Sequence, residues 1–217
     1  MQTPVLSFTF LSNFDNCPRK AWHLYVAKDL PKTPTTPEQQ HGQDVHKAFE
    51  CRLRANKPFG TPYAHYEPFA AAAEQYSGKK LVEENLAITA SGSPTDFFGK
   101  DVWVRGKVDW AVLREDAGVI LDWKTGKPRE DAFELELFAL MLKCTYPGLK
   151  SLTGIYVWLK DNKLGKVHDL SNFARTYNDV KLRSKDIEAL DPDKEWPAKP
   201  NPLCGWCPHK KCEHNKS

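Results

Sequence analysis

Two short stretches decide the fold of this chain: Gly106-Lys-Val-Asp109-Trp110, and Leu121-Asp122-Trp123-Lys124-Thr125-Gly126 after it. The tight connection from Arg114 to Gly118 between them predicts a β-hairpin. That hairpin places position 109 opposite position 122 or 123. Directly opposed residues of an antiparallel pair have Cβ atoms about 4.5–5.5 Å apart. The two carboxylates can therefore share one divalent cation.

The second strand adds an ammonium group beside the two acids. Asp122 and Lys124 lie two positions apart, so both side chains point to one face of the strand. Two acids and a lysine suit metal-assisted phosphodiester hydrolysis, in which the acids hold Mg²⁺ or Mn²⁺ and the lysine stabilises the attacking water or the developing phosphate charge. Asp and Lys on a strand are most often a solvated ion pair. Here the apolar run before Asp122 favours a site at a strand end.

Around the hairpin, the hydrophobic pattern predicts alternating helices and strands. A first helix starts near Ser7 or Thr9, reaches about Val26 and is interrupted at Pro18. Further helices are predicted over 38–55, 68–76, 130–144 and 173–190, and strands over 81–90, 102–113, 119–124, 152–159 and 165–170. This order predicts a small mixed sheet flanked by helices, of the α/β or α+β class. We expect one domain over 1–217, with a helical part (1–80), a catalytic sheet with its core helix (81–170) and a C-terminal helix with a metal-binding tail (171–217).

Composition limits the classes of protein to which the chain can belong. Of its 217 residues, 41% are hydrophobic, which is enough for a core. The mean hydropathy of -0.58 and the lack of a long apolar run exclude a transmembrane helix. The first residues show no secretory signal, so we expect a cytoplasmic protein with no membrane partner. The net charge of +3 neither requires nor excludes a nucleic-acid partner.

The cysteines near the C-terminus predict a metal–thiolate site. They are Cys204, Cys207 and Cys212. Cys17 and Cys207 each precede a proline, as cysteines in bacterial iron–sulfur runs often do. With Cys17 as the fourth ligand, the site ties the two ends of the chain together. Zinc is the alternative, with Cys17, His209 or His214 completing the shell.

Two positions upstream of the hairpin are also candidate site residues. His46 lies on the predicted helix 38–55, with Gly42 one turn before it. A neutral imidazole is a competent ligand for Mn²⁺, although a single helical histidine is more often a surface residue. Glu83 and Glu84 open the predicted strand 81–90, and we expect one of them to reach the metal or the attacking water.

Taken together, these motifs resemble the PD-(D/E)xK nucleases. The pattern combines Gly42-x-x-x-His46, a glutamate before the hairpin, the two hairpin motifs and the segment from Glu134 to Ala139. It is most similar to the RecB-like branch, especially the iron–sulfur exonucleases of the CRISPR-adaptation type and their phage relatives. The resemblance extends from Cys17 to Cys212, and it implies a restriction-endonuclease-like core.

The resemblance also implies residue roles. The metal ligands are His46, Asp109 and Asp122, helped by the backbone carbonyl of Trp123, and the cluster ligands are Cys17, Cys204, Cys207 and Cys212. Lys124 is the catalytic lysine, and Glu83 matches the upstream acid better than Glu84. Glu134 and Phe138 stand where the family often has Gln and Tyr, so we expect substrate contact there in altered form.

The implied function is a Mg²⁺- or Mn²⁺-dependent deoxyribonuclease, most simply an exonuclease acting on DNA ends or single strands. A structural 4Fe–4S cluster, or zinc in its place, completes it, and the implied location is the cytoplasm of a bacterium or of a phage-infected host cell. Trp22, Trp103 and Trp123 either stack on bases or pack in the core. The alternatives are a DNA-binding or assembly module that does not cleave, and a structure- or sequence-specific endonuclease.

Overall fold

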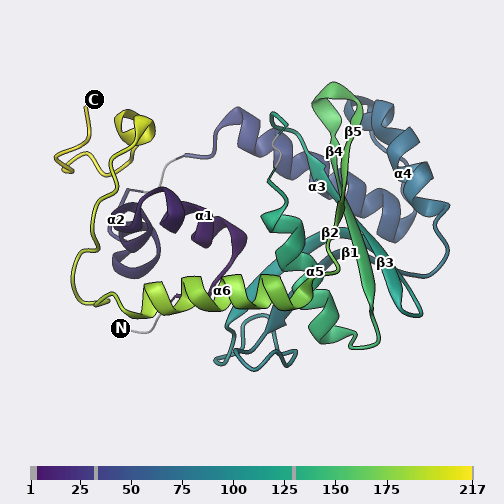
Figure 1. Ribbon diagram of the computed structural model, residues 1–217. Coiled ribbons are helices and arrows are strands. Elements are labelled where there is room, and N and C mark those ends of the chain that lie inside the picture. The colour runs from purple at the N-terminus through teal and green to yellow at the C-terminus, as the bar shows by residue number, and fades with distance from the viewer. Residues whose placement is uncertain (1–3, 32–33, 129–130, 217) are drawn as a thin grey trace. The chain divides into compact units, whose positions relative to one another are not determined.

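A computed structural model describes residues 4–31, 34–128 and 131–216 (Figure 1). The chain divides into two compact units. One runs from Thr35 to Thr176, and the other joins the residues up to Pro34 with those from Tyr177 onward. The assignment of both units to a single nuclease domain stays a prediction.

The larger unit is built on one mixed sheet of five strands in the order β1-β2-β3-β4-β5. The strands are β1 (Lys79–Ile88), β2 (Val104–Arg114), β3 (Ala117–Lys124), β4 (Ser151–Trp158) and β5 (Lys163–Asp169). Only the β3–β4 pair is parallel, and the other three pairs are antiparallel. Arg114 pairs with Ala117, so the predicted hairpin closes over a two-residue turn. The mixed sheet with flanking helices confirms the predicted fold class.

One face of the sheet is covered by α3 (Pro37–Ala55), the 3₁₀ segment η2 (Thr61–Tyr66) and α4 (Glu67–Glu74). A capping box begins α3: the Thr36 side chain accepts from the Gln39 backbone N–H, and the Gln39 side chain accepts from the Thr36 N–H. At the centre of this core, the Phe49 ring stacks on Trp123 with centroids 4.3 Å apart. Trp123 is 1% exposed, so the suggestion that it stacks on bases is wrong.

Helix α5 (Phe133–Thr145) packs on the other face. Its side chains are apolar almost all round, as is typical of a buried helix, and those from Leu137 to Leu142 are buried. The helix approaches β2 so closely that a Cβ atom on Gly106 would lie 2.9 Å from the Met141 Cε and 3.0 Å from the Phe138 Cε1. A larger residue at this position would push the Met141 methyl group and the Phe138 ring away from β2. The predicted helix started at Glu130, which lies outside the described residues.

The smaller unit brings the two ends of the chain together. Its N-terminal helices are α1 (Phe8–Asn16), α2 (Pro18–Ala21) and the π-helix η1 (Trp22–Ala27). Ser7 caps α1, and the helix breaks at Cys17 before Pro18, as predicted. After α6 (Phe173–Glu188), an extended tail leads to the short 3₁₀ helix η4 (Pro202–Trp206). The Arg19 backbone N–H donates to the Pro197 carbonyl at 3.1 Å, so this tail packs against the N-terminal helices.

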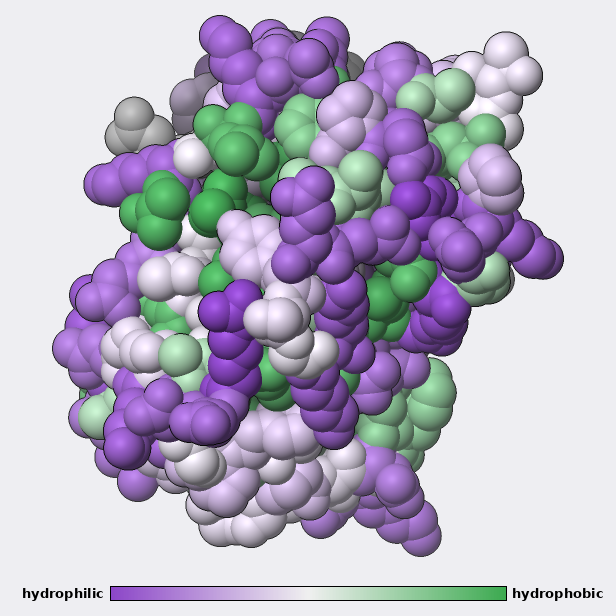
Figure 2. All heavy atoms as spheres, turned by 90° about the vertical axis from the view of Figure 1, so that its right-hand side faces the viewer, coloured by the Kyte–Doolittle hydropathy of each residue, from purple (hydrophilic) through white to green (hydrophobic). Residues whose placement is uncertain are grey.

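Figure 2 shows one face of the molecule, on which hydrophilic side chains predominate and apolar ones form scattered patches. Within the described ranges, we find no helix with the length and apolar character needed to cross a bilayer.

Candidate functional site

Three potential metal ligands from three different elements converge in the larger unit. His46 comes from α3, Glu83 from β1 and Asp109 from β2. The His46 Nδ1 lies 3.2 Å from the Asp109 Oδ1 and 3.4 Å from the Glu83 Oε1. One ligand atom from each residue lies within 4.8 Å of the other two. We call these three residues the ligand triad.

The backbone is irregular where the triad lies. Glu83 has a φ of 49°, in the left-handed region that residues with a Cβ rarely adopt. The β1–β2 pairing passes over it, from Val82–Trp110 to Glu84–Val108. A non-glycine residue held in this region costs of order 1–3 kcal/mol, and such strain clusters at functional sites. The irregularity turns Glu83 toward His46, while Glu84 stays paired within the ladder and outside the triad.

A second charged group is built around Lys124 at the end of β3. Its Nζ lies 2.6 Å from the Asp122 Oδ2 and 2.8 Å from the Glu134 Oε2 at the start of α5. The contact with Asp122 agrees with the expectation that both residues share a face. The Nζ also lies 5.5 Å from the centroid of the Tyr156 ring. We call Asp122, Lys124 and Glu134 the lysine group.

The sheet register brings the triad and the lysine group side by side. Trp110 pairs with Leu121, so the next residues in each direction, Asp109 and Asp122, lie level on adjacent strands. The Trp123 backbone N–H donates to the Asp109 Oδ2 at 2.8 Å, which ties the Asp109 carboxylate to β3. The two acids therefore lie side by side in the sheet, and their sharing of one cation stays a prediction. Of the ligand set expected from the resemblance, His46 and Asp109 meet Glu83, whereas Asp122 contacts Lys124.

The electrostatics of the triad favour charged forms. Burial by itself lowers the pKa of His46, but hydrogen bonds to Asp109 and Glu83 outweigh it and raise that pKa to about 10. Burial by itself raises the pKa of Glu83, but His46 and Lys107 outweigh it and lower the pKa. In the metal-free protein, His46 is therefore a cation at neutral pH that stands between two carboxylates.

In the lysine group, desolvation affects the two partners differently. Burial raises the pKa of Asp122 well above its usual value, and the charge of Asp109 adds to the rise. Burial by itself lowers the pKa of Lys124, but the charges of Asp122 and Glu134 outweigh it and raise that pKa. Lys124 therefore stays an ammonium, while burial disfavours the carboxylate form of Asp122 unless a cation is present to stabilise it.

Two open grooves adjoin these groups. The first, of about 710 Å³, is lined by the whole triad with Lys47 and Lys107. The second, of about 760 Å³, is lined by Thr125, Gly126, Lys127 and Lys160 with the start of α3. Gln39 and Gly42 line both grooves, so the two adjoin along α3. A ligand can therefore reach the triad from solvent.

The sequence reasoning missed two residues of the site. Lys107 makes an ion pair with Glu83, and Tyr156 pairs with Asp122 across the parallel β3–β4 ladder. Lys107 stood inside the motif Gly106–Asp109, and its charge was the available signal. Tyr156 gave none, because the partner of Asp122 depends on the strand order.

The two residues expected to contact substrate have different surroundings. Glu134 points at Lys124, so its charge is compensated within the protein. Phe138 is 6% exposed and packs over Gly106. Its ring belongs to the interface between α5 and β2, and it offers no surface to a substrate. This burial argues against substrate contact at Phe138, and contact at either residue stays a prediction.

The donor chemistry of the triad fits a hard divalent cation. Carboxylate oxygens are the ligands that Mg²⁺ and Mn²⁺ prefer, and an imidazole suits Mn²⁺ as well. Glu83 and Asp109 are buried, at 8% and 6% exposure, and each faces the same histidine nitrogen. A cation placed there would replace the proton on His46 and neutralise both acids.

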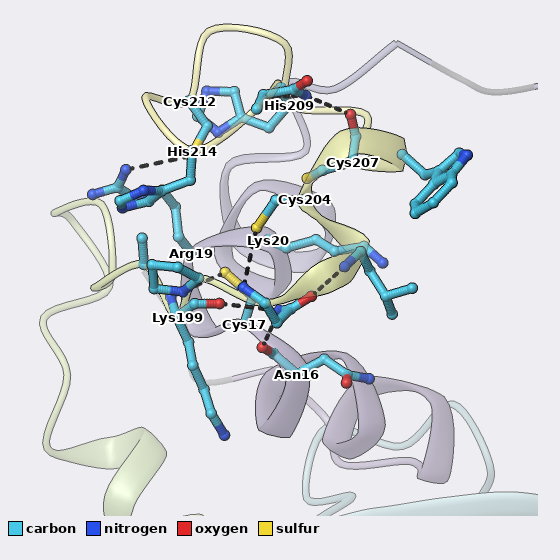
Figure 3. A pocket seen from close by; sticks show the side chains of 16 residues that line it. Asn16, Cys17, Arg19, Lys20, Lys199, Cys204, Cys207, His209, Cys212 and His214 are labelled. Carbon is cyan, nitrogen blue, oxygen red and sulfur yellow. Dashed lines mark hydrogen bonds between the residues drawn. The ribbon is translucent and has the colours of Figure 1, made fainter. Parts of the chain in front are cut away.

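In the smaller unit, the four predicted cluster ligands line one cavity of about 200 Å³ (Figure 3). Backbone or guanidinium N–H groups approach three of the sulfur atoms: Lys199 N at 3.5 Å from Cys17 Sγ, Asn201 N at 3.3 Å from Cys204 Sγ and Arg19 Nη1 at 3.7 Å from Cys212 Sγ. Hydrogen bonds to the sulfurs are part of how proteins tune iron–sulfur clusters. The donors around this cavity therefore suit charged thiolates.

The size of the cavity bears on which inorganic group it suits. The sulfurs of a tetrahedral zinc site lie about 3.8 Å apart, given Zn–S bonds of about 2.3 Å. Among the described residues, the groups of three whose ligand atoms lie within 4.8 Å of one another contain no cysteine. The cavity has room for several water-sized volumes, more than one ion fills. No three of these four sulfurs therefore lie as close together as a tetrahedral zinc site requires.

Comparison with known proteins places this geometry in context. The crystal structure of SSO0001 is similar to the chain, with a TM-score of 0.48 and 11% sequence identity over 100% of this chain and 89% of that one. No curated protein matches the sequence. The family model of the PD-(D/E)XK nuclease superfamily matches residues 5–212, which is nearly the whole chain. The chain belongs to the PD-(D/E)XK nuclease superfamily.

Proposed function

We propose that the protein is a Mg²⁺- or Mn²⁺-dependent deoxyribonuclease. One observation carries the proposal: the ligand triad lies next to the lysine group, with Asp109 and Asp122 level on adjacent strands. The superfamily makes the chain a nuclease, and the neighbouring ligands and ammonium supply the parts that metal-assisted hydrolysis requires.

The residues of the site would have separate roles in metal binding and in charge stabilisation. His46, Glu83, Asp109 and Asp122 would hold the metal, which supplies Lewis-acid charge to the scissile phosphate and to the attacking water. Lys124 is held in position by two carboxylates, so its ammonium is preorganised toward that phosphate. The backbone N–H of Trp123 fixes the Asp109 carboxylate through a hydrogen bond of 2.8 Å.

DNA is the proposed substrate, and DNA ends or single strands are the proposed sites of attack. Lysines line both grooves beside the site: Lys47 and Lys107 in one, Lys127 and Lys160 in the other. Lysines along a groove neutralise phosphates without reading sequence. The proposed preference for ends rests on the RecB-like motif pattern. A nuclease with this preference is an exonuclease.

For the cysteine cavity we propose a structural 4Fe–4S cluster on Cys17, Cys204, Cys207 and Cys212. The N–H donors around the sulfurs and the size of the cavity support it. An absorption spectrum of anaerobically purified protein tests it. A brown protein with broad absorption near about 400 nm supports the cluster, and a colourless protein contradicts it.

The test of hydrolysis is Mn²⁺-dependent degradation of end-labelled DNA. Asp109→Ala and Lys124→Ala should each lower the rate by about 10²–10³-fold, the usual cost of losing one charge-stabilising group. Asp116→Ala, in the exposed hairpin turn, is the matched control and should keep the wild-type rate, because exposed ion pairs contribute little. Full activity in both site variants would overturn the proposal. Cleavage of circular DNA would favour an endonuclease.

A second candidate is a DNA-binding or assembly module that does not cleave. It is favoured by the Lys124–Glu134 contact, which neutralises the ammonium before any phosphate arrives. DNA retention on filters, with no product under any divalent metal, would support this candidate against the first.

A further inference from the structure

A second group of potential ligands lies in the smaller unit, apart from the four cysteines. It consists of His23 in η1, Glu195 in the extended tail and His209 in the C-terminal segment. One ligand atom from each lies within 4.8 Å of the other two. The His23 Nε2 is 2.7 Å from the Glu195 Oε1, and the two imidazole rings have centroids 3.9 Å apart.

Asp29 orients the first histidine. The Nδ1 of His23 lies 2.8 Å from the Asp29 Oδ1, so a proton on Nδ1 is donated to that carboxylate. An ion that replaces the proton on Nε2, the atom that faces Glu195, would bind the lone pair there. A carboxylate on the far nitrogen is the usual support of a metal-bound histidine, because it fixes the ring and raises its basicity.

The second histidine has an unexplained nitrogen. The Nδ1 of His209 is buried and has no hydrogen-bond partner within the part of the chain that the structure describes. A buried polar atom without a partner costs about 1–3 kcal/mol. A neutral imidazole is the form that binds metals. A purely structural role for His23 between two acids leaves this nitrogen of His209 unexplained.

The geometry requires a small adjustment to admit an ion. With Zn–N and Zn–O bonds of about 2.0–2.2 Å, neighbouring ligand atoms of a tetrahedral site lie about 3.3 Å apart. The 2.7 Å contact between His23 and Glu195 would widen by about half an ångström. The Glu195 side chain is 41% exposed and can move outward. Its other oxygen lies 3.2 Å from the Arg19 Nε, which neutralises charge that the ion does not.

We propose that His23, Glu195 and His209 form a site for a divalent transition ion, with Zn²⁺ the best match, separate from the nuclease centre and from the cysteine cluster. Two imidazoles and one carboxylate, with water in the fourth position, are a known zinc donor set. The ion would link η1 to the tail, so its role is to fix the fold of this unit. His209 then belongs to this site, and the fourth ligand of the cysteine cavity is Cys17.

The experiment uses the full-length chain with Co²⁺ as a spectroscopic probe. All samples carry Asp109→Ala, which weakens metal binding at the ligand triad. We expect one equivalent of Co²⁺ whose spectrum lacks the thiolate charge-transfer band, because no sulfur ligand takes part. His209→Ala and Glu195→Gln should lose that equivalent. His214→Ala, a matched histidine in the same tail, should keep it.

A milder variant separates metal binding from misfolding. Asp29→Ala keeps all three ligands and changes a side chain that is 53% exposed. It should weaken Co²⁺ binding by about 10–100-fold, the usual effect of removing the carboxylate behind a ligating histidine. Unchanged affinity in Asp29→Ala would overturn the proposal, as would a wild-type chain without a sulfur-free Co²⁺ site.

Discussion

The ligand triad and the lysine group are neighbours in the same sheet, but they are assembled in opposite ways. The triad takes one residue from each of three elements, His46, Glu83 and Asp109, and its backbone is strained at one of them. The lysine group takes residues close in sequence from the end of β3 and the start of α5. The triad opens on a groove, whereas Asp122 is 2% exposed. The triad can therefore accept a cation from solvent, whereas Asp122 and Glu134 hold the Lys124 ammonium in place.

The largest effect is expected from a substitution of Glu83 in the triad. Glu83→Gln keeps the size of the side chain but removes a buried ligand charge, so Mn²⁺-dependent cleavage should fall by about 100-fold or more. Glu84→Gln, one residue along, should stay within about twofold, because Glu84 is paired in the ladder with Val108. Single-turnover rates at saturating Mn²⁺ measure both. Equal losses in the two variants would contradict the assignment of Glu83.

In the lysine group, one substitution should raise stability and lower activity. An acid whose pKa is raised by folding holds its proton more tightly in the folded chain, so its carboxylate costs stability at neutral pH. Asp122→Asn should therefore raise the melting temperature of the metal-free protein at pH 7 by about 2–4 °C, or about 1 kcal/mol. The same variant should cleave poorly. Calorimetry in EDTA decides it, and a lower melting temperature would contradict the prediction.

A pH dependence distinguishes the triad from the lysine group. The pKa of His46 rises from 6.5 to about 10 on folding, so the imidazolium stabilises the folded, metal-free chain below pH 6.5 and this contribution is lost as the pH climbs to 10. Urea unfolding in EDTA should show wild type more stable than His46→Gln at pH 6, with the gap closing by pH 10. A gap that widens with pH would reverse the sign and refute this account of His46.

The smallest effect concerns Lys107, which is 49% exposed and pairs with Glu83. Lys107 is half-exposed and His46 still faces the buried Glu83 carboxylate, so Lys107→Ala should change the unfolding free energy by only about 1 kcal/mol. Its effect on DNA should be larger, because removing one phosphate-binding lysine reduces the salt dependence of DNA binding by about one charge. Binding measured across salt concentrations checks this, with Lys150→Ala, just before β4, as the control.

The part of this architecture that depends on local pattern was predictable. The hairpin, the shared face of Asp122 and Lys124 and the helix break at Cys17 follow from strand alternation, turn residues and a proline. The contact between His46 and Asp109 depends on packing between elements far apart in sequence, and only the family resemblance predicted it. The burial of Phe138 was not predictable, because it depends on the contact with Gly106, between elements far apart in sequence. Tyr156 was missed because the sequence of neither strand determines the register of a parallel pair.

The left-handed backbone at Glu83 imposes two demands that no single amino acid meets well. Glycine would relax the chain there but brings no carboxylate, and every residue that brings a carboxylate carries a Cβ that the conformation disfavours. Stabilising searches on this scaffold, whether by directed evolution or by consensus, should therefore drift toward glycine or asparagine at position 83. The selected variants should be more stable and less active than the wild type. Their sequences would show that the residue at position 83 supports activity at the expense of stability.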